Sequence, residues 1–393
     1  MIAGEGASMN YAGMASNAEA SMETKKLRRI ALLISAAILL ATACATQLTT
    51  PEPKREPIAR IEMGVGHFNR DGKAFHNWDK DKEIPAVCAR CHGANSVPEY
   101  LRTGKTAPAA HVKNGYACTN CHSDLLTYER HKVDKVTFAS GLTVDSGNNN
   151  SNLCMTCHQG RESTASVNKA IAGQALDTVN PKLTFVHVHY FPAGATLFGT
   201  QAKVGYEYTG KSYVGRFGHV EGMNACTNCH DPHAGEVRIE KCGACHEGVK
   251  SLADTKGIRM NSKGDWDGNG RAEGIAREID NLKRELYAAI QQYARVVGGA
   301  AIAFTPQGFP YWHTDTNGNG RVDPEEFRPA NSYKAYTPRL TQAIYNYTFA
   351  LRDPGAAYHN GAYTAQLLYD SLESLGASGK IEASVQGKTR AAR

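Results

Sequence analysis

The 393-residue sequence is short of three things that would point to familiar classes of protein. Its apolar run at residues 30–40 is shorter than the roughly 20 residues that a helix needs to cross a bilayer. Its formal net charge is only +6, so charge alone identifies no strongly acidic or basic partner. Outside one repeated pattern it has a single cysteine, Cys44, so that pattern accounts for nearly all of the cysteine in the chain.

The repeated pattern is Cys-x-x-Cys-His. It occurs five times, at Cys88, Cys91 and His92; at Cys118, Cys121 and His122; at Cys154, Cys157 and His158; at Cys226, Cys229 and His230; and at Cys242, Cys245 and His246. The pattern is the attachment signature of haem c, in which two thiols bond to the porphyrin and the next histidine binds iron on the proximal side. Zinc knuckles and thioredoxin-like pairs also use Cys-x-x-Cys, but neither requires a histidine after every second cysteine. The sequence therefore predicts five covalently attached haems.

Haem would also change the charge balance. Each ferric haem adds roughly −1, because its two propionates outweigh the charge of the ferric porphyrin core. Five haems would cancel most of the positive surplus, so we expect no nucleic-acid partner.

The N-terminal segment predicts export. Lysines and arginines at positions 25–29 precede the apolar run, and small residues at 41–43 follow it, as in a secretory signal peptide spanning residues 22–43. Residues 1–21 have no such pattern, and we interpret them as a mis-called N-terminal extension with Met22 as the true start.

Cys44 lies where the signal peptide would be cleaved, and it resembles the lipid-modified cysteine of bacterial lipoproteins. Ala41 stands where such signals prefer leucine, and plain cleavage to a soluble periplasmic protein is the alternative. We expect a lipid anchor at the outer membrane, facing the periplasm or the cell exterior, with residues 44–60 as a tether.

Two parts follow the tether. Residues 61–255 contain all five motifs and predict a pentahaem cytochrome domain, haem-rich and mostly irregular with short α-helices. In residues 256–376 the apolar residues recur at helical spacing, which predicts a small α-helical domain with EF-hand-like loops. Helices are expected at 275–297, from Pro338 to the turn at Asp353, and at 362–375. The small and polar residues 377–393 predict a flexible tail.

The sixth ligand of each iron decides what such a protein does, because a second histidine closes the iron whereas an open face admits a substrate. Ten histidines lie outside the motifs, more than the five that are needed: His67, His76, His111, His131, His187, His189, His219, His233, His313 and His359. Methionine is the rival ligand, but a lone methionine more often fills a core.

Several segments around the motifs occur in a distinctive order. They include Phe75-His76-Asn-Trp78, Val188-His189-Tyr190, Phe217-Gly-His219 and His230-Asp-Pro-His233. In this order they resemble the multihaem c-type cytochromes of metal-respiring bacteria, which are exported or lipid-anchored. The resemblance covers residues 66–376 and implies haems with two histidine ligands. The histidines that lie within the resembling segments are the distal candidates: His67, His76, His189, His219 and His233.

The remaining histidines leave alternatives open. His187 could replace His189, and His111 or His131 could displace His67 or His76. His313 and His359 lie beside expected helix ends, where histidines usually cap or fill, and stay outside the candidate set.

Two acidic loops predict calcium. In the loop at 315–326 the candidate ligands fall at EF-hand positions with Gly320 at the sixth: Asp315, Asn317, Asn319, Arg321, Asp323 and Glu326. The loop at 265 begins the same way, with Asp265, Asp267, Asn269 and Glu273. Ala276 takes its twelfth position, so this site is expected to be weaker or to be completed by another group. Paired turns that bind no ion are the alternative to structural Ca²⁺.

The motifs predict an electron carrier with no catalytic residues, which exchanges electrons with other cytochromes or with an outer-membrane conduit. One alternative is a reductase in which one open haem acts on a small nitrogen or sulfur oxyanion. The chain has no Cys-x-x-Cys-Lys motif, the active-site haem signature of many nitrite reductases. The other alternative is a subunit of a cytochrome filament. Such subunits borrow histidines from neighbours, whereas this chain has a surplus.

Overall fold

The structure of the chain is a computed structural model that describes residues 67–68, 73–110, 115–259 and 264–392. The expected signal peptide, Cys44, the tether and His111 lie outside the described residues.

The motif-bearing part contains little regular structure, as the sequence predicts. Its helices are short: α2 (Lys73–His76), α3 (Ala86–His92), α4 (Val97–Thr103), α5 (Asn149–Met155), α6 (Thr164–Ile171), α7 (Ala193–Phe198), α8 (Cys226–Cys229) and α9 (Ile239–Gly243), with 3-10 turns η1 (Cys118–Asn120), η2 (Gly199–Gln201) and η3 (Asp254–Gly257). Its strands form three antiparallel two-stranded sheets: β1 (Glu83–Ile84) with β2 (Ala109–Ala110), β3 (Val136–Thr137) with β4 (Thr143–Val144), and β5 (His230–Asp231) with β6 (Glu236–Val237). Ordered loops make up most of the remainder.

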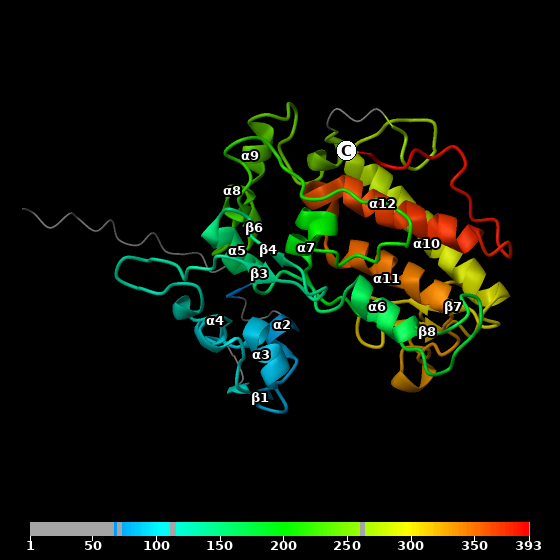
Figure 1. Ribbon diagram of the computed structural model, residues 1–393, viewed down its shortest axis with the longest axis horizontal. Coiled ribbons are helices and arrows are strands. Elements are labelled where there is room, and N and C mark those ends of the chain that lie inside the picture. The colour runs from blue at the N-terminus through cyan, green and yellow to red at the C-terminus, as the bar shows by residue number, and fades with distance from the viewer. Residues whose placement is uncertain (1–66, 69–72, 111–114, 260–263, 393) are drawn as a thin grey trace, which may run out of the picture. The chain divides into compact units, whose positions relative to one another are not determined.

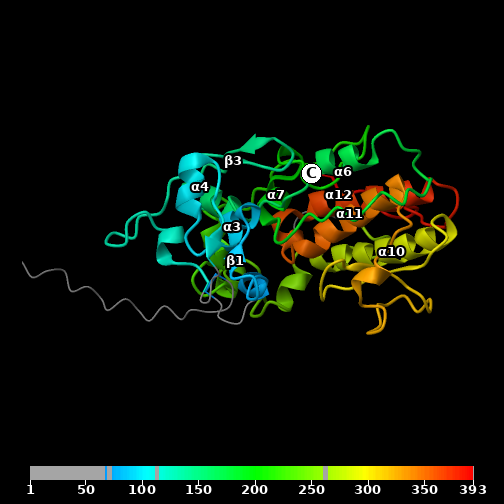
Figure 2. The same ribbon diagram turned by 90° about the horizontal axis from the view of Figure 1, so that it is seen from below.

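Three long helices form the C-terminal part: α10 (Ile275–Val296), α11 (Pro338–Arg352) and α12 (Ala356–Gly376). They pack against one another, as Figure 1 shows in yellow, orange and red and the turned view in Figure 2 repeats. Between α10 and α11 the chain forms an antiparallel hairpin, β7 (Ile302–Phe304) with β8 (Trp312–Thr314), and the short turn η4 (Pro329–Asn331). The three predicted helices are confirmed, although α12 begins earlier than expected and is kinked at Asn360.

The helices form where the sequence places their apolar faces and caps. Along α10, Ile279, Leu282, Leu286 and Ile290 are buried at helical spacing and line the largest core cluster. At the start of α11 the Thr337 hydroxyl accepts a hydrogen bond from the Leu340 amide, at 3.1 Å, directly before Pro338. The core of this part therefore consists of aliphatic and aromatic side chains, most of them from the three helices, with others such as Leu183 and Trp312 from neighbouring segments.

A second core cluster joins segments from both sides of the boundary expected at residue 255. Val167 of α6 and Phe198 of α7 are buried in it together with Tyr345 and Phe349 of α11. Asn346, fully buried, fixes this packing because its amide exchanges hydrogen bonds with the backbone of Tyr206, at 2.7 and 2.9 Å. The middle of the chain thus packs on the C-terminal helices, although it carries haem motifs.

The end of the chain differs from the expected flexible tail. Ala391 is buried, and its carbonyl accepts a hydrogen bond from Gln366 of α12 at 2.8 Å. Arg390 pairs with Asp370 of the same helix, and the Thr389 amide donates to Asp265. Residues 377–392 are small and polar, but specific hydrogen bonds hold them. Among the described residues, the helices are all too short or too polar to cross a membrane.

Candidate haem sites

Each motif folds as one helical turn. In three motifs the histidine amide donates to the carbonyl of the first cysteine: His122 to Cys118, His158 to Cys154 and His246 to Cys242, at 2.8–3.0 Å. His230 makes the same bond at the end of α8, and the first motif lies entirely within α3. This turn holds the two thiols and the imidazole close together on one short segment, as attachment to a single porphyrin requires.

Each motif histidine faces one histidine from elsewhere in the chain. The distances between ring centroids are 5.9 Å for His92 and His189, 6.2 Å for His122 and His233, 6.0 Å for His158 and His67, 6.1 Å for His230 and His359, and 6.2 Å for His246 and His219. The partners come from far along the sequence, so tertiary packing alone brings them together.

These gaps fit an iron atom with two imidazole ligands. A metal–imidazole bond of about 2 Å, with about 1 Å more from nitrogen to ring centre, puts two opposed imidazole centroids roughly 6 Å apart. All five measured distances lie within this range. All ten motif cysteines are free thiols, so each pair of histidines has two thiols available for haem attachment.

Hydrogen bonds orient several of these rings. The Nδ1 atoms of His122, His67 and His359 face acceptors: the Tyr128 carbonyl at 2.8 Å, the Pro232 carbonyl at 3.3 Å and the Asp353 carboxylate at 2.8 Å. An acceptor at Nδ1 fixes the tautomer and leaves Nε2 as the nitrogen that can bind a metal. His189 has φ of +75°, an uncommon conformation for a residue with a side chain, and it directs this ring toward His92.

Burial lowers the pKa of five of the paired imidazoles: His67, His158, His189, His219 and His230. Burial lowers the pKa of His158 to about 4, with a smaller contribution from His67. Burial also lowers the pKa of His189 to about 4, helped by the nearby charges of His92, Arg161 and Arg352. Neutral imidazole is the form that binds a metal, so these two groups are ready to bind at neutral pH.

The pair of His359 and Asp353 has different electrostatics. Burial opposes the charge on each group, but their mutual attraction is stronger. It raises the pKa of His359 above its ordinary value and lowers the pKa of the Asp353 carboxyl, which is 2% exposed. Asp353 follows α11 directly, so the C-terminal helices supply both the histidine and the carboxylate that orients it.

Four of the five distal candidates lie opposite a motif histidine: His67, His189, His219 and His233. The fifth candidate, His76, bonds Asp79 through Nδ1 at 3.0 Å, and the ring that faces His230 is that of His359. His131 bonds the Thr119 carbonyl at 2.9 Å, and His187 lies beside His189 and Arg352. Sequence reasoning missed His359 because it lies beside an expected helix end, where histidines usually act as caps. The only local signal was the acidic turn at Asp353, six residues earlier.

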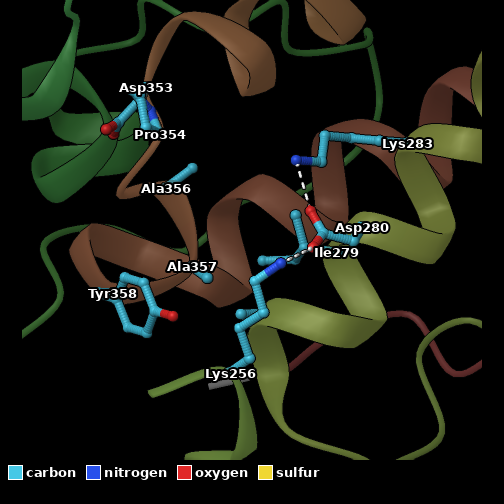
Figure 3. Close-up of a pocket in the computed structure, with 10 residues that line it drawn as sticks. Lys256, Ile279, Asp280, Lys283, Asp353, Pro354, Ala356, Ala357 and Tyr358 are labelled. Atoms are coloured by element: carbon cyan, nitrogen blue, oxygen red, sulfur yellow. Dashed lines mark hydrogen bonds and ion pairs between the residues drawn. The ribbon is translucent and has the colours of Figure 1, made fainter. Parts of the chain in front are cut away.

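A cavity of about 140 Å³ lies next to Asp353. Figure 3 shows Lys256 and Lys283 on its wall, both paired with Asp280, while the oxygens of Asp353 point away from the two lysines. Both lysines are therefore paired with Asp280 rather than with Asp353.

The two acidic loops adopt the same fold. In the loop at 315, the Asp315 carboxylate accepts from the amides of Gly318 and Gly320, both at 2.8 Å, and Asn317 accepts from Asn319 at 3.0 Å. In the loop at 265, Asp265 accepts from Gly268 at 2.7 Å and Gly270 at 2.6 Å, and Asp267 accepts from Asn269 at 3.1 Å. These bonds fix the first aspartate of each loop in the same way, as in a loop that wraps a hard cation.

In each loop a glutamate carboxylate accepts hydrogen bonds from two equivalent backbone amides, although the glutamates stand at different positions relative to the start of the loop. Glu326 bridges the amides of Thr316 and Asp323, at 2.6 and 3.2 Å. Glu278 bridges the equivalent amides of Trp266 and Glu273, at 2.7 and 2.8 Å.

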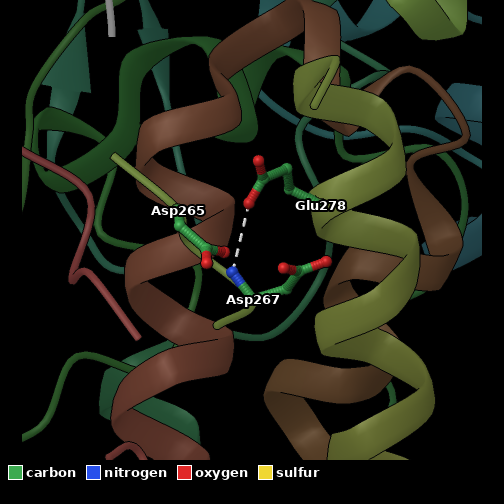
Figure 4. A group of neighbouring side chains, drawn as sticks. All are labelled: Asp265, Asp267 and Glu278. Atoms are coloured by element: carbon green, nitrogen blue, oxygen red, sulfur yellow. Dashed lines mark hydrogen bonds between the residues drawn. The ribbon is translucent and has the colours of Figure 1, made fainter. Parts of the chain in front are cut away.

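Figure 4 shows Glu278 reaching from α10 toward Asp265 and Asp267, and oxygens of these three residues lie within 4.8 Å of one another. The group that completes the 265 loop is therefore Glu278, two residues beyond the expected position. Sequence reasoning missed it because the first turn of α10 shifts the carboxylate along the chain.

Comparisons with known proteins agree with the motif geometry. A family profile described as cytochrome c7 and related cytochrome c matches residues 104–174. The C-type polyheme cytochrome OmcB of Geobacter sulfurreducens is 25% identical over 366 residues, and OmcC of the same species is 26% identical over 382 residues. These alignments cover 76% and 80% of this chain but 45% of each relative, so the chain spans about half the length of the curated relatives that it matches. No solved structure matches the chain.

The profile and the two relatives are all described as c-type cytochromes, which agrees with the repeated Cys-x-x-Cys-His motifs. These findings support a multihaem c-type cytochrome similar to those of metal-respiring bacteria.

Proposed function

We propose that this chain relays electrons through five covalently attached haems, each held between two histidines. The observation that carries the proposal is that every motif histidine has an opposed histidine at 5.9–6.2 Å. With both axial positions taken by protein, an iron has no site for a substrate, and the haem supplies one-electron chemistry only. His359 is the fifth distal ligand in this proposal, in place of His76.

Contacts between the motifs support a relay. Helix α4, which follows the first motif, contacts the second motif, because the Val97 amide donates to Asn120 at 3.0 Å. The first motif itself touches the third, because the Cys157 thiol lies 3.7 Å from the Arg90 carbonyl. Helix α5, which contains the first cysteine of the third motif, contacts the fourth motif through a hydrogen bond of 3.1 Å from the Cys226 amide to Ser151.

The Arg238 amide, directly before the helix α9 that contains the first cysteine of the fifth motif, donates to the Cys229 carbonyl of the fourth motif at 2.8 Å. The attachment sites thus form a continuous series in the order second, first, third, fourth and fifth, which would keep neighbouring haems close.

The purified full-length holoprotein tests this function. We expect five haems per chain in a haem assay, only low-spin signals in low-temperature EPR, and no CO binding by the reduced protein. A high-spin haem that binds CO would overturn the closed-site relay and favour the reductase alternative. A haem count below five would show that one motif is not used.

The same proposal includes the cellular setting. The chain is exported, held at the outer membrane by lipid on Cys44, and exchanges electrons with other cytochromes or with an outer-membrane conduit. The signal-like segment at residues 22–43 supports this setting. Radiolabelled palmitate should enter the wild-type protein but not the Cys44→Ala variant, and the variant should move to the soluble fraction.

Both acidic loops bind structural Ca²⁺ in this proposal. The support is the shared pattern of hydrogen bonds that fixes the first aspartate of each loop and the glutamate that closes it, Glu326 or Glu278. The loops flank α10, because the 265 loop closes on Glu278 of α10 and the Gly320 carbonyl of the other loop accepts from Gln291 of the same helix at 2.9 Å. Their role is therefore to fix the ends of this helix.

A further inference from the structure

Arg352, the last residue of α11, is a buried cation whose charge is not balanced by an acid. It is 6% exposed, and its Nη2 atom has no hydrogen-bond partner among the described residues. Two other arginines that contact the C-terminal helices are each paired with a carboxylate. Arg339, on the same helix, pairs with Asp177 through two bonds of 2.7 and 3.0 Å, and Arg390 pairs with Asp370 through two bonds of 2.8 Å.

The surroundings of Arg352 are aromatic. Its guanidinium lies 4.0 Å from the ring centre of Tyr190 and 4.5 Å from that of Tyr311, and its Nε donates to Nε2 of His187 at 3.2 Å. Aromatic faces attract a cation, but they do not satisfy an N–H group. A buried guanidinium with an open donor is costly unless an anion completes its bonding.

The position of Arg352 points to the source of that anion. Tyr190 and His187, which contact the guanidinium, are also in ring contact with His189, at 5.6 and 5.7 Å between centroids. His189 faces His92 of the first motif. Arg352 therefore lies beside the space between these two histidines, where the proposed function puts a haem. A haem c carries two propionates, and a planar guanidinium binds a carboxylate through two parallel hydrogen bonds.

Resting on the proposed function, we propose that Arg352 binds a propionate of the haem held by His92 and His189. Two consecutive residues at the end of α11 would then act on two haem sites. Arg352 would bind a propionate at the first site, and Asp353 orients His359 opposite the fourth motif. A fixed cation at the propionate reduces the negative potential at the iron and favours the ferrous state. Arg352 is a positioning residue that also raises the reduction potential of this one haem.

The test uses the full-length holoprotein with Arg352→Gln, Arg352→Lys and the matched control Arg339→Gln. Spectroelectrochemical titration of the wild type should resolve five transitions. In Arg352→Gln one transition should shift to lower potential while four coincide with the wild type. Arg352→Lys, which keeps the charge without the planar fork, should shift the same transition less. Arg339→Gln, which removes the same formal charge from a side chain that bonds Asp177 and Ser374 instead of the surroundings of His189, should leave all five unchanged.

Two further measurements keep the outcomes distinct. If Arg352→Gln fails to fold, propionate-sensitive bands in the resonance Raman spectrum of Arg352→Lys should still differ from those of the wild type. Titrating the wild type with acetate tests the source of the carboxylate, because a haem propionate leaves the potentials independent of acetate. Five unchanged transitions in Arg352→Gln, or an acetate-dependent potential in the wild type, would overturn the inference. Loss of low-spin haem from the wild type itself would instead refute the proposed function.

Discussion

Residues 73–110 around the first motif and the helices α10–α12 bury apolar surface to very different extents. The first region has a small apolar cluster of its own, formed by Phe75, Ile84 and Ala89. The three helices share the largest cluster in the described part of the chain, with aromatic residues such as Tyr293 and Trp312 at its centre. A cluster of three side chains is too small to hold a segment folded against its conformational entropy. The motif region must therefore obtain most of its apolar contacts from haem, whereas the helices supply their own.

We expect the largest difference between the two regions when haem is withheld. In chain produced without haem attachment, we expect residues 73–110 to lose their structure, because the porphyrin faces that should fill their core are missing. Helices α10–α12 should persist, since their core needs no cofactor. Limited proteolysis with mass spectrometry would map early cleavage to the motif region. Equal cleavage in both regions would show that the helices also depend on haem.

The second prediction concerns His359, which belongs to the helical region but faces a motif histidine. His359→Ala should convert one of the haems to a high-spin form that binds CO, because one iron loses its second imidazole. His76→Ala is the matched control, and its spectrum should stay low-spin because His76 bonds Asp79 on the surface. EPR of the two variants reads out both effects. The opposite pattern would return His76 to the ligand set.

Calcium removal should weaken the helical region selectively. A site saturated about 100-fold above its dissociation constant contributes about 3 kcal/mol to folding, so a chelator should lower the melting temperature of the helices. Glu326→Gln and Glu278→Gln should each remove part of this dependence. Glu285→Gln, on α10 but paired with Lys388, should retain all of it. Calorimetry with and without Ca²⁺ measures the difference, and a chelator without effect on the wild type would rule out both sites.

The smallest effect concerns the ion pair that joins residue 177 to α11. The hydrogen bonds from Arg339 lower the pKa of the Asp177 carboxyl, so the pair stabilises the fold above the ordinary pKa of an aspartate. This contribution is lost as pH falls through the lowered pKa. The carboxylate is 39% exposed, so solvent screening limits the effect to about 1 kcal/mol. In urea unfolding, the stability of Asp177→Asn should approach that of the wild type as pH falls below the lowered pKa of Asp177, and should lie below it near neutral pH. A constant difference across this range would assign the loss to packing.

Prediction from the sequence succeeded where the signal is local. The spacing of Ile279, Leu282 and Leu286 predicted α10, and the motif spacing predicted a thiol–imidazole turn in every repeat. It failed where a residue acts on a distant part of the chain. Glu278 takes the place of a twelfth loop position, and residues 377–392 are held by bonds to α12 although their composition is that of a flexible segment. Neither result could be read from neighbouring residues.

The sequence by itself determined the number of attachment motifs, the proximal histidines and the long C-terminal helices, because each depends on residues a few positions apart. Only the tertiary structure decided which histidine faces each motif, with His67 opposite His158 and His359 opposite His230. The sequence offers more histidines than partners are needed, and they are chemically equivalent until folding buries and orients them. Folding makes that choice, because it brings one imidazole from a distant part of the chain to about 6 Å from each motif imidazole.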